Sequence, residues 1–115
     1  GPLRKEAYFV TKLISGETGD LYFNSDKHSI DEKRAMAEST VKLLKNIHGL
    51  NISHGDLKIT NIMISDLHPV IIDLDSMKQH GNQSLFNKAK KRDIKRFLKN
   101  WQDSPSLAKI FQSYF

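Results

Sequence analysis

The 115-residue sequence contains no cysteine. This absence excludes disulfide bonds, thiolate zinc sites and cysteine nucleophiles together, and it favours a reducing, cytoplasmic compartment. No apolar run approaches the ~20 residues that a transmembrane helix needs, so we expect no membrane-spanning segment. The first ten residues, GPLRKEAYFV, have neither the apolar core nor the cleavage site of a secretory signal. The sequence also shows no glycine-rich loop of the kind that holds nucleotide phosphates.

The composition is otherwise that of an ordinary globular domain. Hydrophobic residues make up 38% and charged residues 27% of the chain, and this length is sufficient for one domain. The net charge of +5 suits an acidic partner such as a nucleotide, a phosphorylated glycolipid, an anionic membrane surface or a nucleic acid. A solvated basic surface explains the charge equally well. Zinc-finger spacing and interleaved aromatic and basic residues are both missing, so we expect no nucleic-acid binding.

The hydrophobic pattern predicts an α+β fold that is mainly helical. Residues 7–14, AYFVTKLI, are aromatic and β-branched and predict a strand, followed by a hinge or loop at SGETGD. Residues 29–48 predict a long helix, because Ser29 and Glu32 have capping-box spacing. The apolar residues of this helix share one face, and they are Met36, Ala37, Val41, Leu43, Leu44 and Ile47. Two further helices are predicted at 87–101 and 105–114.

A short β-hairpin is predicted between two polar motifs. The runs NIMIS and PVIIDL are apolar and are separated by Asp66-Leu67-His68 and a proline. The motif HGDLKITN lies before the hairpin, in a loop at 52–61, and Asp73 lies after it, in a loop at 73–76. The hairpin should therefore return Asp73 to the side of Asn61. Carboxylate and amide oxygens at such positions suit magnesium binding and the orientation of an acceptor hydroxyl in phosphoryl transfer.

The string H-G-D-L-K-x-x-N, followed by I-D-x-D, resembles the kinase-like phosphotransferase superfamily. Within it, the chain is most similar to the carboxyl-terminal lobe of the bacterial lipopolysaccharide-core kinases, the Kdo/heptose kinase family. Members of that family look like HGDLKATN…LIDLDAM followed by RDxxRFLRNW. This chain reads HGDLKITN…IIDLDSM and then RDIKRFLKNW. The second motif makes the resemblance specific to this family rather than to the superfamily.

The resemblance implies an ATP-dependent kinase that phosphorylates a sugar hydroxyl, with Mg²⁺ or Mn²⁺ as the metal. It makes Asp56 the catalytic base and Lys58 a cation that neutralises the transferring phosphoryl group. Asn61 and Asp73 become the ligands of the nucleotide-bound metal. The acceptor would be a glycolipid or another small molecule with a hydroxyl group. We expect a cytoplasmic location, with peripheral association at the inner membrane left open.

Two further residues take supporting roles by resemblance. His54 would pin the catalytic loop, and Asp93 would hydrogen-bond its backbone. We therefore expect the Asp93 side chain within hydrogen-bond distance of backbone amides in residues 53–56. The other reading of Asp93 is a solvent-facing carboxylate in the basic run KKRDIKR. The same helix should turn three apolar residues into the core, namely Ile94, Phe97 and Trp101.

Several departures separate the chain from regulated protein kinases. Gly55 stands where those kinases have the arginine that senses activation-loop phosphorylation, no glycine follows the motif Asp73-Leu74-Asp75, and no Ala-Pro-Glu element follows. These differences favour a small-molecule or glycan acceptor. The role of Asp75 stays open between a second metal-shell carboxylate, an acceptor-binding group and a loop cap. The basic run NKAKKRDIKRF is either a solvated helix face or a surface for anionic lipid.

The resemblance covers only the hinge and the carboxyl-terminal lobe, over residues 1–115. The nucleotide lobe of the family would need about 70–100 residues before the strand at 7–14. We therefore expect this lobe to be absent, the chain to be a fragment or one part of a larger assembly, and the isolated chain to be inactive. Two alternatives remain: another small-molecule kinase, of the aminoglycoside or choline type, and a non-catalytic kinase-like scaffold.

Overall fold

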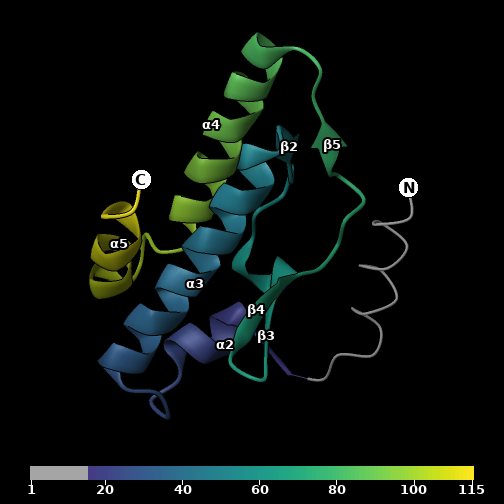
Figure 1. Ribbon diagram of the computed structural model, residues 1–115. Helices are drawn as coiled ribbons and strands as arrows, with labels where there is room; N and C mark the ends of the chain where they lie inside the picture. The colour runs from purple at the N-terminus through teal and green to yellow at the C-terminus, as the bar shows by residue number, and fades with distance from the viewer. Residues whose placement is uncertain (1–15) are drawn as a thin grey trace.

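The computed structural model describes residues 16–115 and shows an α+β fold (Figure 1). Its helices are α2 (Gly19–Asn24), α3 (Ile30–Gly49), α4 (Gln83–Lys99) and α5 (Pro105–Gln112). One antiparallel sheet has the strand order β1 (Glu17–Thr18), β3 (Ile62–Ser65) and β4 (His68–Ile71). A second antiparallel pair joins β2 (Ile52–Ser53) to β5 (Lys78–Gln79). The predicted fold class is confirmed, whereas the strand predicted at 7–14 lies outside the described residues.

Helix α3 begins with the predicted capping box. The Glu32 backbone N–H donates to Ser29 Oγ at 3.1 Å, and the Ser29 N–H donates to Glu32 Oε1 at 2.9 Å. Two backbone N–H donors that have no partner within the helix are thereby satisfied, at an end where the helix would otherwise fray. Of the apolar residues predicted to share a face, Leu43 and Ile47 are half-buried and the other four are buried. The helix prediction was therefore correct in both its start and its buried side.

An aromatic cluster joins the carboxyl-terminal helices to the rest of the core. The ring of Trp101 stacks on Phe111 at 4.4 Å between centroids, and Phe97 meets Phe111 edge-on at 5.0 Å. Phe23 of α2 meets both Trp101 and Phe111 edge-on. These four side chains are at most 2% exposed, and offset or edge-on pairs of this kind add to the stabilisation that burial provides. The cluster fixes α5 against α4 and α2.

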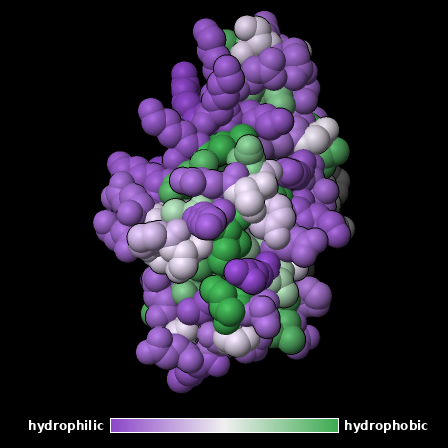
Figure 2. Space-filling view, turned by 90° about the vertical axis from the view of Figure 1, so that its left-hand side faces the viewer, coloured by the Kyte–Doolittle hydropathy of each residue, from purple (hydrophilic) through white to green (hydrophobic). Residues whose placement is uncertain are grey.

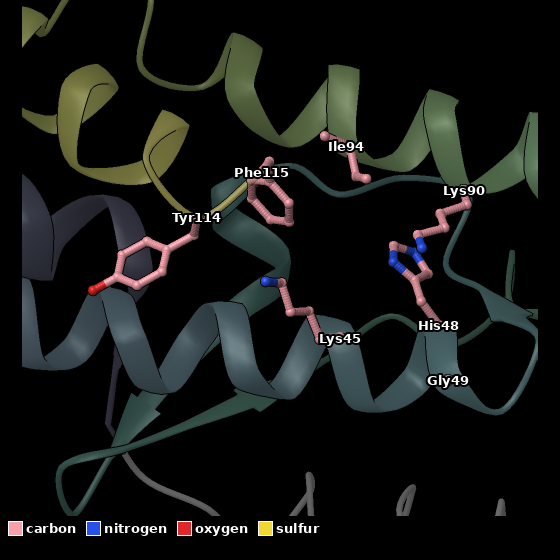
Figure 3. A pocket seen from close by; sticks show the side chains of 7 residues that line it. All are labelled: Lys45, His48, Gly49, Lys90, Ile94, Tyr114 and Phe115. Atoms are coloured by element: carbon pink, nitrogen blue, oxygen red, sulfur yellow. The ribbon is translucent and has the colours of Figure 1, made fainter.

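Ile94 differs from its predicted place in the core. It is half-buried and lines a pocket of about 550 Å³ between α3, α4 and the last residues of the chain. Figure 3 shows its side chain beside this pocket, with Lys90 on the same helix and Lys45 across from it. Phe97 and Trp101 are buried as predicted. The neighbouring elements therefore cover only part of the apolar face of α4.

Residues 16–20 of the segment SGETGD do not form the loop that its glycines predicted. Residues 17–18 form β1, which pairs with β3, and α2 begins at Gly19. A Cβ atom on Gly16 would lie 2.3 Å from the Ile64 carbonyl oxygen, and one on Gly19 would lie 2.6 Å from Ile59 Cδ1. These glycines therefore allow close approach of the backbone to β3 and to the turn before it, and do not mark a flexible turn.

The bounds of the last two helices also differ from the prediction. Helix α4 begins at Gln83 and not at residue 87, because the Asn82 side chain caps it by accepting from the Leu85 N–H at 3.1 Å. Helix α5 ends at Gln112, two residues before the predicted end. On the face that bears α5, apolar side chains form a narrow, broken band among hydrophilic ones (Figure 2). Among the described residues, no helix combines the length and the apolar character needed to cross a bilayer.

Candidate functional site

The hairpin β3–β4 brings the two polar motifs together. Its register pairs Ile62 with Ile71 at the open end, and one step further the Ile72 N–H donates to the Asn61 carbonyl at 2.8 Å. Asp73 therefore follows directly after a residue that is bonded to Asn61. At the closed end, Asp66 and Leu67 have positive φ values of 50° and 63°, as a two-residue type I′ turn requires. The hairpin predicted from the sequence is present.

The Asn61 side chain holds the backbone of the loop that carries Asp56. Its Nδ2 donates to the Asp56 carbonyl at 2.9 Å. The opposite atom of the amide, Oδ1, therefore points away from that bond, and it has no hydrogen-bond partner among the described residues. Lys58 Nζ lies 3.7 Å from Asp56 Oδ2, and its side chain is about half exposed. The loop thus presents a carboxylate, a cation and an amide oxygen on one short stretch of chain.

His54 connects this loop to the loop after the hairpin. The ring is fully buried, and its Nδ1 accepts from the Asp56 N–H at 3.1 Å. Since Nδ1 is an acceptor, the proton of a neutral ring lies on Nε2, which can donate to the Ile72 carbonyl at 3.4 Å. His54 therefore lies between the residue predicted as the base and the residue that precedes Asp73.

Asp93 accepts hydrogen bonds from the backbone of the loop at residues 52–61, as expected. Its Oδ2 accepts from the His54 N–H at 2.9 Å, and its Oδ1 accepts from the Gly55 N–H at 3.0 Å. The carboxylate is 2% exposed. Burial raises the pKa of Asp93, but hydrogen bonds from His48 and from the His54 and Gly55 amides outweigh it, so the pKa lies below its usual value. The reading of Asp93 as a solvent-facing residue is excluded.

Gly55 has a conformation that other residues adopt with difficulty. Its φ is +91°, and a Cβ atom at this position would lie 2.9 Å from Ser76 Cβ. The sharp bend directs the Gly55 N–H to Asp93 while the loop passes close to the segment after Asp73. A glycine is required here because the loop is both bent and closely covered.

Two residues that support the loop were missed by the sequence reasoning. His48 Nε2 lies 2.8 Å from Asp93 Oδ2 and donates to it from the end of α3. The sequence signal that could have indicated its burial is its position on the buried face of α3, one turn after Leu44. Asn100 follows α4 and bonds the loop twice: Oδ1 accepts from the Ile59 N–H at 3.1 Å, and Nδ2 donates to the Leu57 carbonyl at 2.9 Å. Asn100 lies within RFLKNW, so this motif packs against the loop at residues 52–61.

The oxygen donors of the site fit a nucleotide-bound Mg²⁺. Asn61 offers an amide oxygen and Asp73 an exposed carboxylate, both of them hard ligands. Among the described residues, no group of three or more histidine, aspartate or glutamate side chains is arranged to hold a metal. Two protein ligands suffice where phosphate oxygens and waters complete the octahedron. Asp75 is also exposed.

Comparison with known proteins gives a family match over nearly the whole chain. The profile of the lipopolysaccharide kinase (Kdo/WaaP) family matches residues 3–112. The chain is also similar to the serine/threonine-protein kinase RAD53 of Saccharomyces cerevisiae, with 35% identity over 83 residues. That match covers 67% of this chain and 10% of the yeast protein, so the chain spans about a tenth of the relative's length. No solved structure matches the chain significantly.

Proposed function

The chain belongs to the Kdo/WaaP lipopolysaccharide kinase family, and from this premise we propose that it carries the catalytic and metal loops of an ATP-dependent kinase. The proposed acceptor is a sugar hydroxyl of the lipopolysaccharide core. The family match supports the kinase activity and the use of ATP. The departures at Gly55 and after Asp73 support a glycan acceptor over a protein.

In the proposed reaction, Asp56 accepts the proton of the acceptor hydroxyl while the hydroxyl oxygen bonds to the γ-phosphorus. The bond between that phosphorus and the bridging oxygen of ATP breaks, and ADP leaves. Lys58, 3.7 Å from Asp56, neutralises charge on the phosphoryl group as it moves. Asn61 Oδ1 and the Asp73 carboxylate would hold Mg²⁺ or Mn²⁺, which would orient the phosphates and offset their charge.

The observation that carries the proposal is the set of hydrogen bonds that joins the two loops. Asn61 bonds the Asp56 carbonyl through its side chain and the Ile72 N–H through its backbone. The same residue thus sets the distance between the proposed base and the proposed metal carboxylate. The amides of His54 and Gly55 donate to Asp93, and the amide of Ile59 donates to Asn100. Such pre-organisation is the main contribution that a protein makes to phosphoryl transfer.

The metal role of Asp73 provides the experimental test. The assay measures transfer of the γ-phosphate from ATP to lipopolysaccharide core by the full-length product of the reading frame, over a range of Mg²⁺ concentrations. Asp73→Asn should reduce transfer at least about a hundredfold, because a neutral amide replaces the charge that holds a hard cation against the phosphates. The exposed loop residue Asp103 supplies the control, and Asp103→Asn should leave transfer unchanged.

The variant Asp75→Asn decides between two assignments. If Asp73→Asn keeps near-normal transfer while Asp75→Asn loses it, the metal carboxylate is Asp75 and the assignment of Asp73 is wrong. If neither substitution changes the dependence on Mg²⁺, the proposed metal loop is wrong as a whole. Both outcomes are read against Asp103→Asn, so a general effect of lost negative charge cannot be mistaken for either.

A further inference from the structure

A pocket beside Asp56 is lined by three cations, and none of them forms an ion pair with a carboxylate of the described residues. The pocket has a volume of about 370 Å³ and lies between the catalytic loop, β5 and α4. Lys78 comes from β5, and Arg92 and Arg96 come from successive turns of α4. Among the described residues, no carboxylate oxygen lies within 4.0 Å of any of these three cations. Three like charges therefore line one small cavity.

The acidic groups of the same pocket are already engaged. Both oxygens of Asp93 accept hydrogen bonds from the catalytic loop, and one of them also accepts from His48. Asp56 Oδ2 lies beside Lys58, a cation that does not line the pocket. The charges in the lining that have no ion-pair partner are therefore the three cations, and local positive charge concentrates anionic ligands.

We propose that Lys78 and Arg92 form an anion subsite that binds a carboxylate or phosphate group on the acceptor, next to the hydroxyl that Asp56 deprotonates. This inference rests on the proposed function, because it takes Asp56 as the base. Ser76 also lines the pocket and supplies a hydroxyl donor. An anion held by arginine and lysine gains charge-assisted hydrogen bonds, which are shorter and stronger than neutral ones. The subsite would orient a charged sugar and reject a neutral one.

Arg96 is left out of the binding pair because it has a second task. Its Nη1 donates to Asn100 Oδ1 at 3.2 Å, and that oxygen also accepts from the Ile59 N–H of the catalytic loop. Replacing Arg96 would therefore disturb the loop as well as the pocket. The side chains of Arg92 and Lys78 are exposed and make no hydrogen bond or ion pair with the described residues. Substitutions at these two positions test the subsite without touching the support of the loop.

The experiment titrates the ¹⁵N-labelled chain with glucose 6-phosphate, glucuronate and glucose, and follows the backbone amide signals of Gly55 and Ser76. The two charged sugars should shift these signals, and glucose should not. The double variant Lys78→Gln/Arg92→Gln should weaken binding of the charged sugars about tenfold, which is the loss expected for charge-assisted contacts. Whichever charged sugar binds more tightly shows whether the subsite favours phosphate or carboxylate.

The control is Lys91→Gln/Lys95→Gln, which removes the same charge from exposed positions of α4 outside the pocket. Its affinity for the charged sugars should stay within about twofold of the original chain. The proposal is overturned if neither charged sugar binds, if glucose gives the same shifts, or if the control loses as much affinity as the pocket variant. Thermal unfolding of both variants confirms that the comparison is made between folded chains.

The same variants separate this inference from the proposed function. If Lys78→Gln/Arg92→Gln binds charged sugars normally while phosphoryl transfer by the full-length product still requires Asp56, the subsite is wrong and the kinase assignment stands. If charged sugars bind through Lys78 and Arg92 but transfer does not depend on Asp56, the subsite stands and the proposed catalytic base is wrong.

Discussion

Asp93→Asn should destabilise the chain and loosen the loop at residues 52–61. The carboxylate accepts three hydrogen bonds, from the backbone amides of His54 and Gly55 and from His48. An asparagine of the same shape has one acceptor oxygen and one NH₂ group. In either orientation the NH₂ group faces a backbone N–H, so at least one buried donor loses its partner.

The size of the effect follows from these contacts. A hydrogen bond to a charged group contributes about 1.5–3 kcal/mol, and an unsatisfied buried donor costs about 1–3 kcal/mol. Because the replacement keeps part of the network, we expect the free energy of unfolding to fall by about 2–4 kcal/mol. Urea unfolding followed by fluorescence of Trp101 measures this change, since Trp101 is the chain's one tryptophan and is buried in the aromatic cluster.

Hydrogen exchange shows whether the loss is local to the loop. In Asp93→Asn, the amides of His54 and Gly55 should exchange faster by a larger factor than those in the middle of α3. Asp103→Asn is a substitution of the same kind at an exposed position. It should change neither the free energy of unfolding nor the free energy of local opening from hydrogen exchange by more than about 0.5 kcal/mol. A loss below about 0.5 kcal/mol for Asp93→Asn would refute the reasoning, because the buried network would then contribute no more than a surface pair.

Three other predictions concern the same loop. The pKa of Asp93 is lower in the folded chain than in the unfolded one, so the carboxylate stabilises the fold fully at pH values well above the unfolded pKa of about 3.9, and this stabilisation is lost as the pH falls through the folded pKa. The free energies of unfolding of the original chain and of Asp93→Asn, measured with urea, should therefore converge at acidic pH. A constant difference between them from pH 7 to pH 2 would contradict this. Gly55→Ala should cost about 1–3 kcal/mol in the same assay, because φ is +91° and the added methyl meets Ser76, whereas Gly81→Ala, where a Cβ meets nothing within 4 Å, should cost less than about 1 kcal/mol. Asn100→Ala should cost about 1–3 kcal/mol by leaving the Ile59 N–H and the Leu57 carbonyl without their partner, and unchanged exchange of the Ile59 amide would count against this role.

Local patterns predicted the elements whose signals lie within one segment. The capping box of α3 and the alternating runs of the β3–β4 hairpin involve neighbouring residues, and both are present. The contact of Asp93 with the loop spans 38 and 39 residues of sequence, and only the resemblance to a kinase family suggested it. The residues themselves allowed a solvated carboxylate in a basic run equally well.

The errors have a common physical cause, which is that tertiary contacts override local signals. Gly16 and Gly19 were read as turn residues, but they lie where another backbone or side chain approaches closely. His48 was missed by the sequence reasoning because its partner, Asp93, lies 45 residues away in the sequence. Ile94 belongs to the apolar stripe of α4, but no neighbouring element covers it fully. Contacts with residues distant in the sequence decide the structure at each of these positions, and such contacts cannot be predicted from the pattern of a single segment.

The central claim is that Asp56 is the base of a phosphotransferase, and one measurement tests it most directly. The steady-state rate of phosphate transfer from ATP to lipopolysaccharide core is compared between the full-length product of the reading frame and its Asp56→Asn variant. The account predicts that kcat falls about a hundredfold or more while the KM for ATP changes little, because general-base catalysis contributes about 10²–10⁴ and Asp56 is not assigned to nucleotide binding. A variant that retains kcat within about fivefold would contradict the account, since Asp56 would then contribute only positioning or charge and would not be the general base.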